Sequence, residues 1–182
     1  MSNCSISNGW TVGCRDSIGG LNNLYILSGS ITTVTEANGA ISDIDGTGVF
    51  YKFELVKQTA DFTETPTPNN EAGTVFYSQV VNAAFMKMQA SLRNQVKTLA
   101  ASNDLKLIVE TNNGLADGVG QYFLIGQHRG AVLTGGAGTS GTAFGDSNQY
   151  GLNFEALEIY PASEITTTGG DLSTALTGIT IA

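Results

Sequence analysis

One helical pattern between two strand-like segments limits the fold more than any other feature of this sequence. The apolar positions of that pattern follow the spacing i, i+4, i+7 and i+8, which is typical of one face of an amphipathic helix. They are Leu92, Val96, Leu99 and Ala100. We expect a helix over about residues 89–101, ended by the turn-forming residues 102–104. No other stretch shows this pattern, so the sequence predicts a mostly β (α+β) chain with one packed helix.

The segments on both sides of the helix alternate as strands do. Val75, Tyr77 and Gln79 would share one face of the first strand. After the helix, Leu105, Leu107 and Val109 alternate with Lys106, Ile108 and Glu110, which predicts a strand with one buried face. Further strands are expected at residues 24–27, 31–35, 49–57, 122–125 and 150–159. These elements fit a mostly β domain with one packed helix.

Glycine, proline and asparagine mark the expected connections. Asn38-Gly39 is a strong hairpin signal because both residues tolerate positive φ. Turns or loops are predicted at 28–30, 43–48, 112–120 and 135–145. Residues 58–72, which contain Pro66 and Pro68, read as a long exposed loop.

The chain of 182 residues is most simply one domain. We expect a polar N-terminal arm at residues 1–20, a β domain at 21–161 and a C-terminal tail at 162–182, which could add a strand to a neighbouring sheet. The first residues lack a basic segment followed by an apolar block, so no secretory signal is expected. No apolar run approaches the length that a membrane span needs.

The charge of the chain limits its partners. The formal net charge is −8, which argues against a module that binds nucleic-acid phosphates or an anionic membrane surface. Only 13% of the residues are charged, and a surface of low charge is poorly protected against association. The basic residues near the helix, Lys87, Arg93 and Lys97, either cover a solvated face or meet an acidic patch on another copy.

Catalytic and metal-binding patterns are weak. His128 is the only histidine, so it is most simply a polar surface or interface residue rather than part of a triad. The glycines of residues 135–141 lack the Gly-Lys-Ser/Thr ending of a phosphate loop. Cys4 and Cys14 form no metal-binding pair, and we expect both thiols to be reduced.

Two acidic patterns in the sequence lack a residue or an arrangement that their chemistry requires. Asp146 begins a stretch like a calcium loop, but Leu157 occupies the position that needs a bidentate glutamate. Glu155 and Glu158 lie three apart on one strand and so point to opposite faces, which excludes a glycosidase pair. We therefore predict no catalytic residue, no metal site and no cofactor.

Glycine and turn spacings over roughly residues 13–160 carry a resemblance to a known family. They are Gly13-Cys14-Arg15-Asp16 with Gly19-Gly20, the strand–helix junction Phe85 to Asn94, Gly126, Gly130, Leu133-Thr134-Gly135-Gly136, Gly141, Phe144-Gly145-Asp146 and Tyr150. This framework resembles the virion structural proteins of tailed bacteriophages, and most of all their tail tube proteins. The resemblance implies a small β-sandwich or barrel with a flanking helix that forms stacked hexameric rings.

The resemblance also implies the partners and the place of the protein. They would be further copies of the chain, other virion proteins and DNA in transit, in a virion assembled in the host cytoplasm. A capsid auxiliary or decoration protein is an alternative from the same class. A β-sandwich module that binds a glycan is a second alternative, and an enzyme is a distant one for lack of a nucleophile and base.

Overall fold

The computed structural model describes residues 9, 11, 17–114 and 120–182. Most of the predicted arm at 1–20, including Cys4, Cys14 and Gly13 to Asp16, lies outside the described residues, as does most of the 115–120 connection. The elements are β1 (Leu21–Ala37), β2 (Ala40–Glu54), β3 (Asp61–Asn69), β4 (Thr74–Met86), α1 (Ala90–Ala101), β5 (Leu107–Gly114), β6 (Gly120–Ile125), β7 (Ala131–Thr139), β8 (Gln149–Glu158), β9 (Ser163–Ile165), a 3-10 helix (Leu172–Ala175) and β10 (Leu176–Ile181). The prediction of a mostly β fold with one helix is confirmed.

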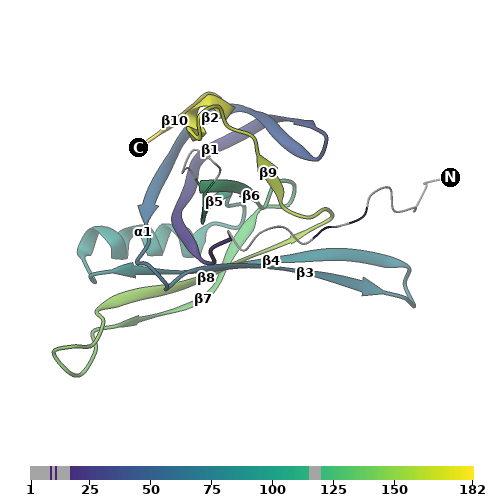
Figure 1. Cartoon of the computed structure of the whole chain (residues 1–182). Coiled ribbons are helices and arrows are strands. Elements are labelled where there is room, and N and C mark those ends of the chain that lie inside the picture. The colour runs from purple at the N-terminus through teal and green to yellow at the C-terminus, as the bar shows by residue number, and fades with distance from the viewer. Residues whose placement is uncertain (1–8, 10, 12–16, 115–119) are drawn as a thin grey trace.

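Five strands form a closed barrel. They pair in the order β1-β5-β6-β9-β2, and β2 pairs with β1 to close the ring. β10 then adds to β2 in parallel, so the barrel carries one extra strand (Figure 1). Closure removes the unpaired edges that an open sheet would expose.

Two glycines allow the long strands β1 and β2 to run without interruption. Gly29 pairs directly with Gly48, and a Cβ atom on either residue would collide with the backbone of the other strand. Residues 24–35 therefore form one strand rather than the predicted pair, and residues 43–48 are part of β2 rather than a turn. The predicted hairpin turn is confirmed, because Asn38 and Gly39 both have positive φ between Ala37 and Ala40.

The barrel encloses its own core of fully buried apolar side chains. Its largest members are Phe50, Ile41, Ile44, Ile108 and Leu124. At one end of it the carboxylate of Glu110, which is 7% exposed, accepts hydrogen bonds from Asn22 Nδ2 (2.9 Å), Asn23 Nδ2 (2.6 Å) and Tyr25 Oη (3.0 Å). A buried charge is tolerated where several donors satisfy it.

The second sheet is open and has the order β3-β4-β8-β7, with antiparallel pairing throughout. One face packs with α1 against the outside of the barrel around a second core, which includes Leu24, Val81, Leu107 and Phe154. β5 lies between the two cores, so Ile108 and Glu110 are buried as well as Leu107 and Val109. The face predicted to be buried is buried, and the opposite face is buried as well.

The helix was predicted almost to the residue. It covers Ala90–Ala101 with Gln89 as its N-cap and Ser102 as its C-cap. Leu99 is buried, and Leu92 and Val96 pack partly buried against the second core. Ala100 is exposed, contrary to the prediction, because it lies at the margin of the buried face.

Two predicted irregular segments are regular parts of the fold. Residues 61–69 form β3, which pairs along its whole length with β4, so the expected long loop is wrong. Within the expected tail at 162–182, β9 pairs with β6 and β2, and β10 pairs with β2 of the same chain. These residues complete the barrel and extend it rather than reach out to a neighbour.

Candidate functional site

The open sheet has one buried and one exposed face. Its buried face consists of the alternate residues of β4 and β8, such as Val81, Phe85, Leu152, Phe154 and Ala156. The other alternate residues are small and mostly polar over much of the exposed face. They include Thr63, Thr65, Ser78, Asn82, Gly151 and Asn153. This alternation is the pattern expected for a sheet that packs on one side only.

The exposed face carries acids, and none of its four strands contains a basic residue. Within β3, β4, β7 and β8, which are fully described, no position is lysine or arginine. Asp61 accepts hydrogen bonds from Asn82 Nδ2 (3.1 and 3.3 Å), and Glu155 Oε1 accepts one from Ser78 Oγ (2.9 Å). Neutral donors hold both carboxylates across neighbouring strands, so their negative charge remains on this face.

The edge strands of the open sheet are β3 and β7. Among the described residues, each pairs with one strand only, except that Ala131 at the start of β7 also exchanges two backbone hydrogen bonds with Leu105. Because four strands alternate in direction, β3 and β7 run in opposite directions. Pro66 and Pro68 have no N–H, so the donors that β3 can offer a new partner lie mainly before residue 66.

A buried polar network fixes one end of this sheet to the barrel. Glu158, only 2% exposed, accepts hydrogen bonds at Oε1 from the backbone N–H groups of His128 (3.1 Å) and Arg129 (2.8 Å). Gln79 Oε1 accepts one from the N–H of Gly126 (3.2 Å). These contacts hold residues 126–130, which connect barrel strand β6 to sheet strand β7. No local signal in the sequence pointed to this network.

The other Glu158 oxygen, Oε2, is buried and has no hydrogen-bond partner among the described residues. Glu158 also lines a cavity of about 260 Å³, together with Phe76, Arg129, Leu157 and Ile159. Phe76, Leu157 and Ile159 are 39%, 49% and 51% exposed, so the sheet has an apolar patch here. Sequence reasoning missed the patch, although Leu157 and Ile159 alternate out of phase with the buried residues of β8.

The residues considered for chemistry are scattered. His128 is exposed and packs edge to face on Tyr160, with 5.8 Å between the ring centres. Glu155 and Glu158 lie on opposite faces of β8, as predicted. Lys87, Arg93 and Lys97 are all exposed. The structure therefore brings none of these side chains together as a reaction centre among the described residues.

The Asp146 segment is a self-contained loop rather than a cation site. Asp146 Oδ2 accepts hydrogen bonds from the backbone N–H groups of Thr142 and Ala143, both at 2.7 Å, and these bonds lower the pKa of the carboxyl. The residues that would complete a calcium loop instead form strand β8. Over the described part of the chain, no group of three or more His, Cys, Asp or Glu residues could hold a metal ion.

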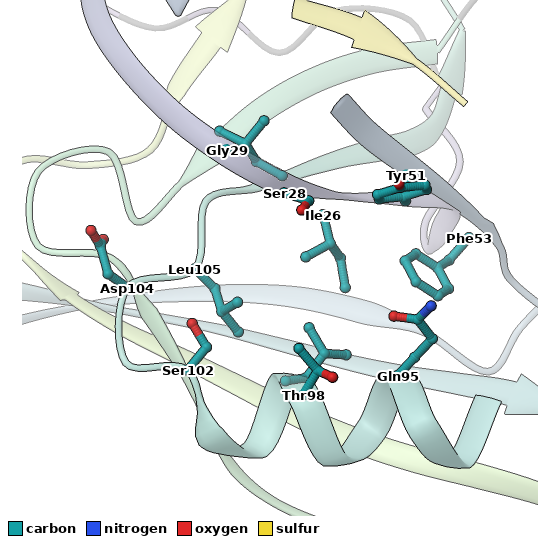
Figure 2. Close-up of a pocket in the computed structure, with 12 residues that line it drawn as sticks. Ile26, Ser28, Gly29, Tyr51, Phe53, Gln95, Thr98, Ser102, Asp104 and Leu105 are labelled. Atoms are coloured by element: carbon teal, nitrogen blue, oxygen red, sulfur yellow. The ribbon is translucent and has the colours of Figure 1, made fainter. Parts of the chain in front are cut away.

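A groove of about 450 Å³ lies between the helix and the barrel (Figure 2). Gln95 and Thr98 extend from the helix toward Ile26 and Phe53 of the barrel strands. The one carboxylate in the groove, Asp104, is paired with Lys106 at 2.7 Å. The lining contains no histidine, cysteine, lysine or arginine, so the groove offers no nucleophile with a base.

The chain matches no protein-family model, no curated protein and no solved structure. In the described residues, no helix is both long and apolar enough to span a bilayer. The candidate functional site therefore rests on geometry alone, and its main feature is the open sheet with its acidic exposed face.

Proposed function

We propose that this chain is a non-enzymatic structural subunit of a tailed-bacteriophage virion, which forms stacked hexameric rings of a tail tube around passing DNA. The observation that carries the proposal is the open four-stranded sheet, whose two free edges run in opposite directions. The resemblance over residues 13–160 supports the same class of protein. Its partners would be further copies of itself and other virion proteins.

The direction of the edge strands suits a ring. When rotation about an axis places β7 of one copy beside β3 of the next, the two strands are antiparallel. Every strand of the ring then alternates in direction, as in a continuous antiparallel barrel. Pairing of this kind also removes the exposed edges that single sheets must otherwise protect.

The chemistry of the exposed face suits a channel for DNA. If this face lines the ring, its small polar side chains leave the channel wide, and Asp61 and Glu155 give it negative charge. Phosphates bind proteins mainly through lysine and arginine, which the four strands lack. A genome could therefore slide along such a wall without adhering to it.

Negative-stain electron microscopy of the purified full chain tests this proposal. Rings or tubes at high protein concentration are expected. A chain that stays monomeric at every concentration and salt condition would overturn the tube function. Monomers or trimers that bind only to an icosahedral shell would instead support a decoration protein.

Amide hydrogen exchange tests the role of the edges without any mutation. Dilute and assembled protein are compared, since exchange reports which backbone N–H groups become protected. We expect new protection in residues 61–65 and 132–139 on assembly and unchanged protection in the barrel strands. Assembly that leaves both edges unprotected would exclude edge pairing as the contact within a ring.

A further inference from the structure

Two complementary features lie at opposite ends of strand β8. At its beginning, the connection of residues 140–148 carries Phe144, whose side chain is fully exposed. At its end lies the apolar cavity between Phe76, Leu157 and Ile159. In Figure 1 the β7–β8 connection projects from one end of the open sheet, and the β3–β4 hairpin extends from the other.

The loop that carries Phe144 is held by its own hydrogen bonds. The Asp146 carboxylate binds the N–H groups of Thr142 and Ala143, and the N–H of Asp146 donates to the carbonyl of Ala143 (3.0 Å). Asn148 Oδ1 accepts a hydrogen bond from the N–H of Met88 (2.9 Å) and so ties the loop to the end of β4. A loop that is ordered before binding loses less conformational entropy on association.

The cavity has the chemistry to receive an aromatic ring. Phe76, Leu157 and Ile159 give it apolar walls, and each is partly exposed in the single chain. Arg129 also lines it, and a guanidinium group attracts the face of an aromatic ring. Exposed apolar patches of this kind mark interaction sites more often than chance surface.

We infer that Phe144 of one copy inserts into the Phe76–Leu157–Ile159 cavity of a second copy. Because the ring and the cavity are at opposite ends of one strand, the contact joins head to tail and repeats along an axis instead of closing a dimer. The inference rests on the proposed function, and it assigns this contact to the stacking of successive rings. It also covers an apolar patch that would otherwise interrupt the polar face of the sheet.

The charges at the two ends support this direction of stacking. Lys87 follows β4 at the end that carries the Phe144 loop, and it is exposed. Glu71 lies in the β3–β4 turn at the cavity end and is exposed as well. A head-to-tail contact brings Lys87 and Glu71, which have opposite charges, to the same interface.

Single substitutions separate stacking from ring formation. Phe144→Ala is compared with Tyr51→Ala, which removes an exposed aromatic side chain from barrel strand β2. We expect Phe144→Ala to raise the protein concentration needed for tubes about tenfold or more, since a buried aromatic anchor carries much of the energy of an interface. Rings should persist, and Tyr51→Ala should form tubes as the unaltered chain does.

A charge exchange tests the partners of the contact directly. Phe144→Lys and Leu157→Glu should each abolish tubes, and the chain that carries both should recover them, because the two new side chains then attract each other. Tubes formed normally by Phe144→Ala, or no recovery in the double variant, would overturn this inference while leaving the tube function intact. An unaltered chain that forms neither rings nor tubes would overturn both.

Discussion

The barrel and the open sheet differ in whether the edges of their strands are paired. The barrel closes on itself, buries Phe50, Ile41 and Ile44 completely, and gains β10 as an added strand. Among the described residues, the open sheet leaves one side of β3 and, apart from Ala131, one side of β7 without a strand partner, and it keeps one face exposed. The barrel therefore needs no partner, whereas the sheet has the hydrogen-bonding groups of an incomplete structure. If the proposed function holds, the barrel stabilises the chain and the sheet assembles it.

A Phe→Ala substitution made in each region should show the largest difference between an effect on folding stability and an effect on assembly. Phe50→Ala in the barrel removes a side chain that is 0% exposed and should lower the free energy of unfolding by about 3–5 kcal/mol. Phe76→Ala on the exposed face of the sheet removes the same atoms from a side chain that is 39% exposed and should cost about 1 kcal/mol or less. Chemical denaturation of the dilute protein measures both.

For tube assembly, Phe76→Ala should have a direct effect, although it costs little stability. Phe76→Ala should impair tubes, because Phe76 lines the stacking cavity, at a concentration where the monomer is fully folded. Equal losses of stability in the two variants would show that the exposed face contributes to folding as much as the barrel does, which would contradict the division of roles.

A polar substitution inside the barrel should have the next largest effect. Glu110→Gln replaces one carboxylate oxygen with an amide group that donates, so at least one donor among Asn22, Asn23 and Tyr25 loses its acceptor. An unsatisfied buried donor costs about 1–3 kcal/mol. Glu54→Gln, at an exposed position of β2, is the matched control and should change thermal stability little. A Glu110→Gln chain as stable as the unaltered protein would mean that the carboxylate is not needed in the barrel.

The buried tyrosines should make the barrel sensitive to alkaline pH. Burial and the nearby Glu110 raise the pKa of Tyr122 to about 12 and raise the pKa of Tyr25 further. The unfolded chain loses these protons near the ordinary tyrosine pKa of about 10, so stability is complete below that pH and falls as the pH rises above it. Unfolding measured from pH 9 to 12 should show a smaller decrease for Tyr25→Phe and Tyr122→Phe than for the unaltered chain. An unchanged profile would exclude these residues as its source.

The sequence predicted best the elements that local rules determine. The helix follows from a period of 3.6 residues, and the turn at Asn38-Gly39 follows from two residues that accept positive φ. The strand expected at residues 150–159 is β8, and its buried residues Leu152, Phe154 and Ala156 alternate strictly. Each of these features can be recognised without knowledge of any distant residue.

The sequence failed where a distant strand determines the structure. Gly29 reads as a break, yet pairing with Gly48 continues β1 through it. Pro66 and Pro68 suggest a loop, yet an edge strand tolerates proline when its other residues pair, and β4 provides that partner. Residues 162–182 have no strong pattern of their own, and they become strands because β2 is available to them.

The candidate site was predictable only in part. The alternation of side chains along β8 predicted which residues lie on each of its faces, and the composition showed the shortage of basic residues. The cavity around Phe76 and Leu157 needs the register of β4 against β8, which the sequence does not contain. The buried Gln79 and Glu158 gave no signal either, because their partners are backbone groups far along the chain.

The smallest effect on stability should come from a substitution at Asp146, in the loop that carries Phe144. Its Asp146 carboxyl has a pKa lowered by hydrogen bonds from the N–H groups of Ala143 and Thr142. The folded state therefore favours the ionised form, so this contribution is present above the unfolded pKa and is lost as the pH falls through the lower folded value. Asp146 is fully exposed, so Asp146→Asn should barely change the melting temperature of the dilute protein at neutral pH.

Assembly should respond to Asp146→Asn more than folding does. An amide is a weaker acceptor than a carboxylate for two N–H groups, so the loop should lose order and hold Phe144 less firmly. We expect tubes to need a higher protein concentration, with a smaller change than for Phe144→Ala because the aromatic ring itself remains. Ser147→Ala in the same loop is the control, since no hydrogen bond of its side chain holds the described loop. A melting temperature lowered by several degrees, with assembly unaffected, would place this loop among the parts that stabilise the fold and would remove it from the assembling surface.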